Sequence, residues 1–305
     1  MLPIYFAPLQ GYTEDVYRRL HHELFGHVEA YYTPFVRLEN GSPRSKDLRD
    51  IKPENNVDLP LVVQIIASSA AEVETLLSVV TPLGYKRVDI NMGCPFPLQT
   101  RHGRGAGLLP HPDVVNGICD IVRRRDDVTF SVKMRLGLAS ADEWHEIVPI
   151  LNDTPLTNVV VHPRVASQQY KGTTDMEAFA RFVDTCRHPV IYNGDITTPQ
   201  QIHQLEATYP IAGVMIGRGL LARPSLAADY QMGVETSHEA LISSLKTLHA
   251  RMLADYERII PRDSQRLMKV RTMWDFMEET LGRKAWKKVM KAGNMKNYLA
   301  AIDQL

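Results

Sequence analysis

The chain has 305 residues, which is too long for one minimal domain and fits a barrel of roughly 250 residues with a small appendage. Its hydrophobic content of 44% is ordinary for a soluble globular protein, and no stretch approaches the roughly 18 apolar residues that span a bilayer, so no membrane role is expected. Lysine plus arginine and aspartate plus glutamate balance at 35 each, which argues against a protein that meets nucleic acid over its whole surface.

The N-terminal segment MLPIYFAPLQ has neither a positive n-region nor a long apolar core, so it predicts a first strand rather than a signal peptide. We therefore expect a cytoplasmic protein. The three cysteines, Cys94, Cys119 and Cys186, are too few and too scattered for a disulfide framework or a metal cluster. Reduced thiols and no metal site are expected.

Short β-branched and apolar runs, each followed by a polar or glycine-marked segment, recur through the first three quarters of the chain. Several are apolar at consecutive positions, as a parallel strand covered on both faces requires. The eight predicted strands are Ile4–Leu9, Ala30–Val36, Leu61–Ile66, Arg87–Gly93, Thr129–Leu136, Thr157–Pro163, Pro189–Ile196 and Gly213–Leu220.

Helical patterns such as Ala70–Val80 and Asp113–Arg124 lie between these runs. Eight strands that alternate with helices predict an α/β fold of the TIM (β/α)8 barrel type, with an open doubly wound sheet as the alternative. After Leu221 the strand pattern stops, which predicts a small all-α helical bundle. We place the domains at residues 1–235 and 236–305.

Four helices are expected in the second domain. The spacing Thr236–Glu239 is that of a capping box before Ala240–Ile260, and Asp263 is expected to cap a helix that runs to Gly282. Two shorter helices are expected at Arg283–Ala292 and Asn294–Ile302, with Gly293 between them.

Basic residues are concentrated in this second domain. Between residues 258 and 296 there are eleven basic and four acidic residues. A solvated helix face and an RNA-binding face both fit such a cluster. The basic residues are Arg258, Arg262, Arg266, Lys269, Arg271, Arg283, Lys284, Lys287, Lys288, Lys291 and Lys296.

In a TIM barrel the active site forms at the carboxyl ends of the strands, and here those ends carry varied polar residues. Gly194, Gly217 and Arg218 on the last two strand ends suit a phosphate group, although such glycines can also serve only as tight turns. Lys133 and His162 on neighbouring strands could contact a flat, electron-accepting ring. No GxGxxG follows a strand, which argues against a tightly held dinucleotide.

Cys94 differs from the other two cysteines because it lies at a strand end, before the long glycine-bearing loop at residues 96–107. A thiol with a pKa near 8.5 is mostly protonated at neutral pH and can donate a proton. Cys119 and Cys186 lie in apolar, helix-like surroundings and are expected to be packing residues. A buried, inert Cys94 remains the structural alternative.

With these residues in place, the sequence resembles the tRNA-dihydrouridine synthase family. The segments APLQGYT, VDINMGCP, GAGLL, SVKMRLG, VVHPR, YNGDI and MIGRGLL occur in that family's order. The resemblance covers Leu2 to about Leu221 and, more weakly, the helices that follow. TPFVR and KVRTMWDF are similar to the bacterial subfamily C pattern, whereas Phe96-Pro97, Pro163 and Pro34 depart from the family.

The resemblance implies an enzyme with a bound FMN, NADPH or NADH as the transient reductant, and tRNA as the substrate. Separately from the resemblance, we expect a monomer. Hydride would reach C6 of uracil from the flavin while Cys94, the catalytic acid, protonates C5. The implied RNA-binding residues are Arg37, Asn91, Arg135, Tyr170 and Arg271. The implied FMN-binding residues are Ala7, Pro8, Leu9, Gln64, Lys133, His162, Asn193, Gly194, Asp195, Gly217 and Arg218.

Subfamily C points to a D-loop uridine, with position 16 the candidate, while Pro34 stands where that subfamily usually has Glu. The sequence leaves open which uridine is reduced and whether the substrate is tRNA or ribosomal RNA. Two other classes also remain. One is a small-molecule FMN oxidoreductase of the dihydroorotate dehydrogenase type, which would not need basic helices. The other is a non-catalytic tRNA-binding flavoprotein, which would not need Cys94.

Overall fold

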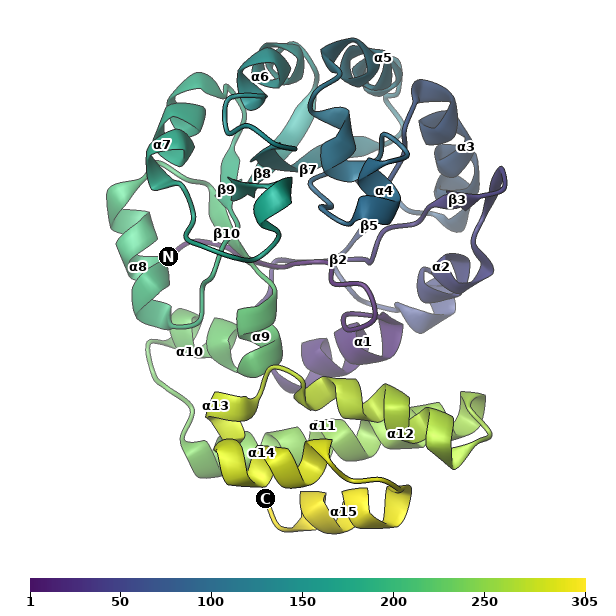
Figure 1. Ribbon diagram of the computed structural model, residues 1–305, viewed down its shortest axis with the longest axis vertical. Coiled ribbons are helices and arrows are strands. Elements are labelled where there is room, and N and C mark those ends of the chain that lie inside the picture. The colour runs from purple at the N-terminus through teal and green to yellow at the C-terminus, as the bar shows by residue number, and fades with distance from the viewer.

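The computed structural model describes residues 1–305 and shows a closed barrel of eight parallel strands with a helical region beside it (Figure 1). The predicted TIM barrel is confirmed, and the open sheet is excluded. Around the barrel the strands follow one another as β1 (Ile4–Phe6), β10 (Gly213–Ile216), β9 (Val190–Tyr192), β8 (Leu156–Val165), β7 (Thr129–Gly137), β6 (Arg87–Met92), β5 (Leu61–Ile65) and β2 (Ala30–Tyr32).

A layer of helices surrounds the strands, as Figure 1 shows. Its members are α1 (Asp15–Leu24), α3 (Ala70–Val80), α5 (Pro112–Arg123), α6 (Trp144–Asn152), α7 (Met176–Thr185), α8 (Pro199–Thr208) and α10 (Leu226–Met232). Shorter elements are the hairpin β3 (Leu38–Glu39) and β4 (Ser42–Pro43), and the helices α2 (Ser45–Asp50), α4 (Pro97–Thr100) and α9 (Arg218–Ala222). The hairpin and α2 were not predicted.

Strand residues alternate between the helix layer and the barrel interior, because successive side chains of a strand point to opposite faces. On β5, Val63 and Ile65 belong to the large core between strands and helices, whereas Val62 belongs to a separate small cluster inside the barrel. This interior cluster consists of Ala7, Ala30, Tyr32, Val62, Val160, Ile191 and Met215. Closer to the carboxyl ends of the strands, the next inward positions carry polar side chains. The interior of the barrel is therefore apolar, and its opening at the carboxyl ends is polar.

The eight predicted strands all exist, but four predictions extended three or four residues too far, because β1, β2, β9 and β10 end at Phe6, Tyr32, Tyr192 and Ile216 rather than at Leu9, Val36, Ile196 and Leu220. Strand β10 ends at Ile216, and Arg218 already begins helix α9, with Gly217 before it. The run GVMIGRGLL is apolar on both sides of this break, so its composition conceals the change from strand to helix.

The helical region contains α11 (His238–Ile259), α12 (Asp263–Arg271), α13 (Glu278–Leu281), α14 (Arg283–Met290) and α15 (Met295–Asp303), which is one helix more than predicted. The predicted helix from Asp263 to Gly282 is wrong because it breaks after Arg271 into a short 3-10 turn. The break buries Trp274, whose indole donates to the Tyr298 hydroxyl at 2.8 Å. Burial of this aromatic pair outweighs continuation of the helix.

Two predicted caps are also corrected. Ser237, rather than Thr236, is the N-cap of α11 and accepts from the Ala240 N–H, while Thr236 donates to the buried Asp229 carboxylate. Asp263 lies in the first turn of α12, after the N-cap Arg262. None of the helices combines the length and the apolar character that crossing a membrane requires.

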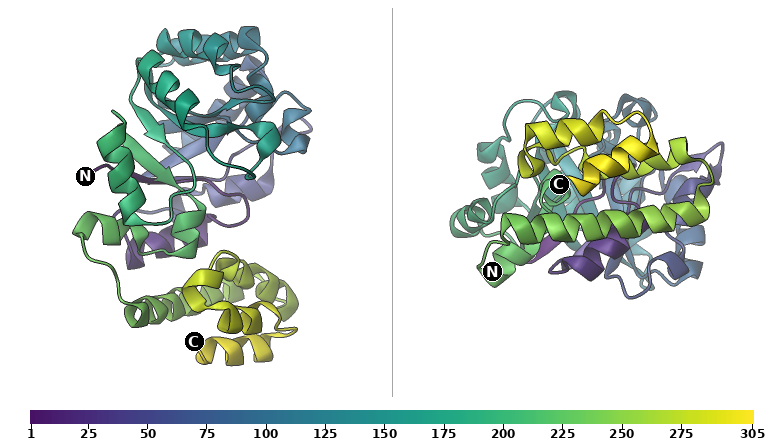
Figure 2. Two further views of the ribbon diagram at one scale, coloured as in Figure 1. Left: turned by 60° about the vertical axis from the view of Figure 1, so that its left-hand side comes forward. Right: turned by 90° about the horizontal axis from the view of Figure 1, so that it is seen from below.

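The helical region packs against the barrel on the side of β1 and α1 (Figure 2). The Tyr12 hydroxyl donates to Asp275 at 3.0 Å, and the Lys269 ammonium donates to the Gly11 carbonyl at 3.2 Å. Thr280 donates to the Ala222 carbonyl at 2.7 Å. Further ion pairs join α1 to α11, namely Arg19 with Asp255 and Arg251 with Glu23.

Candidate active site

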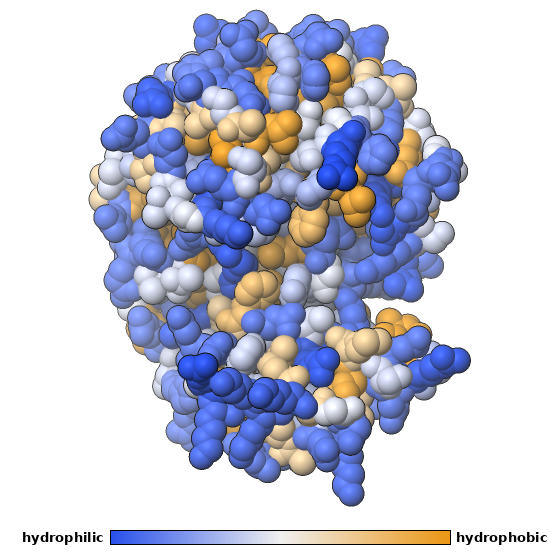
Figure 3. All heavy atoms as spheres, in the orientation of Figure 1, coloured by the Kyte–Doolittle hydropathy of each residue, from blue (hydrophilic) through white to orange (hydrophobic).

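A cavity of about 1010 Å³ opens at the carboxyl ends of the strands. This volume is at the upper end of the usual range for ligand sites. Its mouth lies on the face drawn in Figure 3, where hydrophobic spots surround a hollow in a mostly hydrophilic surface. All predicted site residues except Arg271 line this cavity. Their individual roles in binding or catalysis stay predictions.

A hydrogen-bond network of buried polar side chains lies on the β5, β6 and β7 side of the cavity. The fully buried Gln64 donates to Asp89 at 2.7 Å, and its carbonyl oxygen accepts from the Asn91 amide at 2.8 Å. Ser131 donates to the other Asp89 oxygen at 2.6 Å. Burial raises the pKa of Asp89 to about 6, although the Ser131 and Gln64 bonds favour its carboxylate form. The network fixes the orientation of both amides.

Cys94 follows β6 at the rim and is held through its backbone. The Asn91 side-chain oxygen accepts from the backbone N–H groups of Gly93 and Cys94, the latter at 2.8 Å. The Cys94 carbonyl accepts from the Ala106 N–H at 3.1 Å, so the loop closes back on the cysteine. Burial raises the pKa of the Cys94 thiol, and nearby Arg135 and Lys133 only partly oppose this. The thiol is therefore protonated at neutral pH.

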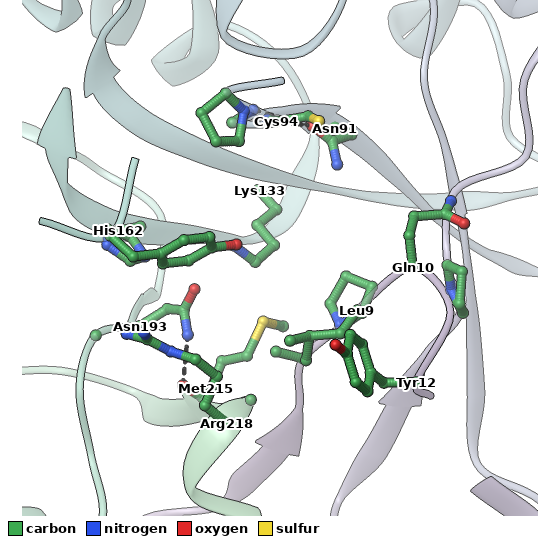
Figure 4. Close-up of a pocket in the computed structure, with 18 of the residues that line it drawn as sticks. Leu9, Gln10, Tyr12, Asn91, Cys94, Lys133, His162, Asn193, Met215 and Arg218 are labelled. Carbon is green, nitrogen blue, oxygen red and sulfur yellow. Dashed lines mark hydrogen bonds between the residues drawn. The ribbon is translucent and has the colours of Figure 1, made fainter. Parts of the chain in front are cut away.

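Lys133 and Arg135 project inward from β7 at alternate positions. The Lys133 ammonium has no hydrogen-bond or ion-pair partner in the protein, and burial together with Arg135 lowers its pKa to about 8. Arg135 is buried, donates to the Gly93 and Val165 carbonyls at 3.1 and 3.0 Å, and has a pKa that burial lowers to about 10. Arg135 thus ties the ends of three strands together. Figure 4 shows Lys133 between Cys94 on one side of the cavity and Arg218 on the other.

Arg164 is a site residue that the sequence analysis did not assign. It is buried on β8, two residues after His162, and one guanidinium nitrogen lies 3.2 Å from His162 Nε2. Because a guanidinium can only donate, Nε2 accepts and the imidazole proton sits on Nδ1. Burial, with the surrounding cationic side chains, lowers the pKa of His162 well below its usual value. The ring is therefore neutral, with a free N–H for a ligand.

The ends of β9 and β10 form the opposite wall. Asn193 donates to the Met215 carbonyl at 2.7 Å, and Arg218 donates to Asp195 at 2.6 Å. Burial alone would raise the pKa of Asp195, but Arg164 and Arg218 outweigh it and the pKa lies below the usual value. A Cβ on Gly217 would lie 2.9 Å from Leu9 Cδ1, so glycine here lets the chain after β1 approach β10 closely. The Arg218 charge is partly neutralised by Asp195, which the sequence analysis did not foresee.

Tyr170 stands at the rim and is 47% exposed. The Arg218 guanidinium lies 4.6 Å and the Arg135 guanidinium 5.5 Å from the ring centre. Both are cation–π distances. Arg37 lies on the other side of the mouth and pairs with Glu39 at 3.5 Å. The rim is thus aromatic and cationic.

The helical region completes the cavity wall, with Phe276 and Glu279 among the lining residues. The Phe276 ring meets Tyr12 edge-on, with ring centres 5.1 Å apart. Sequence reasoning missed both residues. Arg271 lies away from the cavity, and its guanidinium donates to the Met290 and Ala292 carbonyls at 3.3 and 3.2 Å. It therefore caps the end of α14, and a contact with RNA stays a prediction.

A closed (β/α)8 barrel whose strand ends enclose a large polar cavity, with a protonated thiol at its rim, has the architecture of a barrel enzyme. The family model described as "Dihydrouridine synthase (Dus)" matches residues 5–303. The chain belongs to the dihydrouridine synthase family and is a flavin-dependent oxidoreductase. The resemblance expected from its motifs is confirmed.

Curated relatives of similar length carry related names. The chain is 27% identical to "tRNA-dihydrouridine(16) synthase" of Cupriavidus necator, over 84% of this chain and 85% of the relative. It is 30% identical to the protein of the same name from Pseudomonas syringae pv. tomato, over 74% of each chain. It is 28% identical to "Probable tRNA-dihydrouridine synthase 2" of Bacillus subtilis, over 83% and 78%.

Solved structures share the barrel. Histamine dehydrogenase from Rhizobium sp. 4-9 matches with a TM-score of 0.56 and 10% identity, over 80% of this chain and 48% of that one. The old yellow enzyme from Trypanosoma cruzi matches with a TM-score of 0.50 and 12% identity, over 78% and 91%. At these identities the likeness concerns the fold alone.

Proposed function

We propose that this protein is a cytoplasmic, monomeric tRNA-dihydrouridine synthase that uses FMN and NADPH or NADH to reduce a D-loop uridine. The observation that carries the proposal is a protonated Cys94 held at the rim of a cavity whose unpaired polar groups suit a flavin. The names of the relatives support a tRNA substrate and position 16. Pro34, at the cavity mouth, departs from the subfamily pattern and makes position 16 the point to test first.

The cavity residues fit FMN. Lys133 and His162 line the cavity, and neither the Lys133 ammonium nor His162 Nδ1 has a hydrogen-bond partner in the protein. Leaving such groups unpaired when buried costs about 1–3 kcal/mol each. The isoalloxazine edge would satisfy both. Arg218 beside the closely packed Gly217 would hold the phosphate at the opposite wall. When bound, FMN supplies the hydride that saturates the uracil 5,6 double bond.

The chain itself supplies the proton. Cys94 would donate its thiol proton to C5 of the uracil, and solvent would restore it, so one hydride and one proton enter the base. Asn91 holds the backbone of Cys94, and the Asp89–Gln64 pair holds Asn91. Lys133 and Arg135 lie near enough to favour the thiolate that proton donation leaves behind. The network therefore positions the acid, and the two cationic side chains favour its thiolate form.

The substrate base must leave its stack to reach the cavity, at a cost of roughly a few kcal/mol. Lysines of α14 and the turn that follows could offset this cost by binding the RNA backbone. Lys284 and Lys291 are exposed and have no acidic partner, and the surface over α13 and α14 in Figure 3 is strongly hydrophilic. Lys269, in contrast, is committed to Gly11 and Glu14 of the barrel.

The test is dihydrouridine formation in tRNA transcripts by the protein reconstituted with FMN, in wild-type form and as Cys94→Ala. We expect the wild type to reduce one D-loop uridine, and Cys94→Ala to retain FMN and lower the single-turnover rate by roughly 10²–10⁴-fold. Cys119→Ala, at a buried thiol outside the cavity, is the matched control. A wild-type enzyme that binds FMN but reduces no uridine would overturn the proposal.

A further inference from the structure

Large exposed apolar side chains gather at the mouth of the cavity. The chain exposes ten such residues, and three of them line this one cavity, namely Phe96, Leu98 and Tyr170. Phe96 is 64% and Leu98 72% exposed, which is unusual for side chains that gain free energy by burial. Both belong to the segment that begins α4, directly after Cys94 and Pro95. Of the three, only Tyr170 contacts arginine side chains, namely those of Arg135 and Arg218.

The segment that carries Phe96 and Leu98 is firmly held. The Phe96 carbonyl accepts from the N–H groups of Gln99 and Thr100 at 2.8 and 3.0 Å. Gln99 is buried, and a Cβ on Gly107 would lie 2.6 Å from the Thr100 carbonyl oxygen, so two backbone stretches touch here. The backbone that carries the exposed Phe96 is therefore fixed by hydrogen bonds and by close packing. A rigid ring loses little conformational entropy when it binds.

The surroundings of Phe96 and Leu98 are cationic. Arg101 is exposed on the same loop, and Arg37, which pairs with Glu39, lines the cavity mouth next to the loop. Aromatic rings interleaved with basic side chains are the usual surface for unpaired nucleotides, whose bases stack while their phosphates are neutralised. An apolar protein partner would not need these charges. The combination favours single-stranded RNA as the occupant.

The position of Phe96 limits which nucleotide it can meet. Two residues span at most about 7 Å, so Phe96 lies within that distance of Cys94 along the chain. Cys94 must touch the reacting uracil if the proposed function holds, and the reacting base fills the cavity below. The Phe96 ring at the rim can then contact only a base that stays outside the cavity, next to the flipped uracil.

We propose that Phe96, with Leu98 at its side, is a stacking platform for the base of a nucleotide adjacent to the reduced uridine. This inference rests on the proposed function and deepens it. Phe96 supplies a flat aromatic face, Leu98 extends the apolar ledge, and the cations Arg101 and Arg37 face the adjoining phosphates. The platform contributes to affinity for the unpaired loop and makes the identity of the neighbouring base part of substrate choice, since purines stack more strongly than pyrimidines.

The test compares Phe96→Leu, which keeps an apolar side chain without an aromatic face, with Phe96→Tyr, which keeps the face. Base stacking contributes roughly 1–3 kcal/mol, so kcat/KM for tRNA should fall roughly 5- to 150-fold in Phe96→Leu and stay within about twofold in Phe96→Tyr. The loss should lie mainly in KM for tRNA. Val57→Ala, at an exposed apolar residue outside the cavity, is the matched control.

A second readout uses tRNA with 2-aminopurine on either side of the target uridine. Wild type and Phe96→Tyr should quench its fluorescence at one of the two positions, and Phe96→Leu should not. Equal kcat/KM for Phe96→Leu and wild type, or a rise in KM confined to NADPH, would overturn the stacking role. A wild-type enzyme that reduces no tRNA refutes the proposed function instead, so the two failures are distinguishable.

Discussion

Gly105→Ala should slow uridine reduction by displacing the loop that contacts Cys94, beyond any effect of the substitution on the stability of the fold. Gly105 has φ +59°, and a Cβ there would lie 2.8 Å from both the Cβ and the carbonyl oxygen of Cys94. One obstacle is backbone, so the added methyl cannot be accommodated by a side-chain rotation. The loop must move away from Cys94 instead, which breaks the Ala106 N–H bond to the Cys94 carbonyl.

The magnitude follows from two effects. Left-handed backbone costs a residue with a Cβ roughly 1–2 kcal/mol, and this strain alone lowers stability. Relief of the clash displaces the loop by several tenths of an ångström or more, and misplacement of a reacting group by about 1 Å can cost roughly 10²-fold in rate. We expect a single-turnover rate of uridine reduction lowered by about 30- to 100-fold, with FMN content maintained.

Gly103→Ala is the matched control because Gly103 lies in the same loop with φ +66° but has no atom nearer than 3.8 Å from a new Cβ. Both variants carry the backbone strain, and only Gly105→Ala disturbs Cys94. Urea unfolding and single-turnover reduction of tRNA would be measured for each. Equal rates for the two variants at equal stability would refute a role of the loop in positioning the thiol.

Three further outcomes are expected. Replacement of Lys284, Lys287 and Lys291 by Gln should weaken tRNA binding. The slope of log affinity against log salt concentration should flatten by somewhat under one unit for each phosphate that is no longer neutralised. The control Lys86→Gln should change neither quantity, and an unchanged slope in the triple variant would place the RNA elsewhere. Burial lowers the pKa of His249 to about 4, below its usual 6.5, so the unfolded chain binds more protons and stability should fall by about 1.5 kcal/mol between pH 6.5 and pH 5 through this residue. In urea unfolding, His249→Gln should lack this part of the loss of stability between pH 6.5 and pH 5. Parallel curves of stability against pH for the variant and the wild type would contradict the expectation. Denaturation should release FMN intact, one per chain, and a flavin that stays attached would exclude the non-covalent site.

The barrel was predictable because parallel strands carry a dense local signal. LVVQI, NVVVH and GVMI are largely buried on both faces, and the structure places each in the barrel. The same signal fails at its limits, because Gly219 and Leu220 are buried like strand residues and only the backbone at Gly217 ends the strand. Thr272 to Phe276 carry helical periodicity, yet burial of Trp274 against Tyr298 depends on α15, which lies far along the chain.

Much of the site was also predictable, since strand ends of a closed barrel must converge. Arg164 could have been assigned from its spacing, because it lies two residues after His162 and so shares the inward face of β8. Phe276 and Glu279 could not, because they reach the cavity only through the packing of the helical region on Tyr12 and Ala222. Nor does sequence show that Arg271 is held by carbonyl groups at the end of α14.

The contribution of Phe276 and Glu279 to the cavity wall bears on how modular this chain is. The segment between α10 and α11 is a natural place to cut, but a barrel cut there would have an open flank where the helical region now stands. Water would enter beside Leu9 and Tyr12, and Asp275 would no longer pair with the Tyr12 hydroxyl. The two halves therefore cannot be exchanged as independent cassettes, and a chimera that joins this barrel to another helical region must reproduce the Tyr12–Phe276 contact.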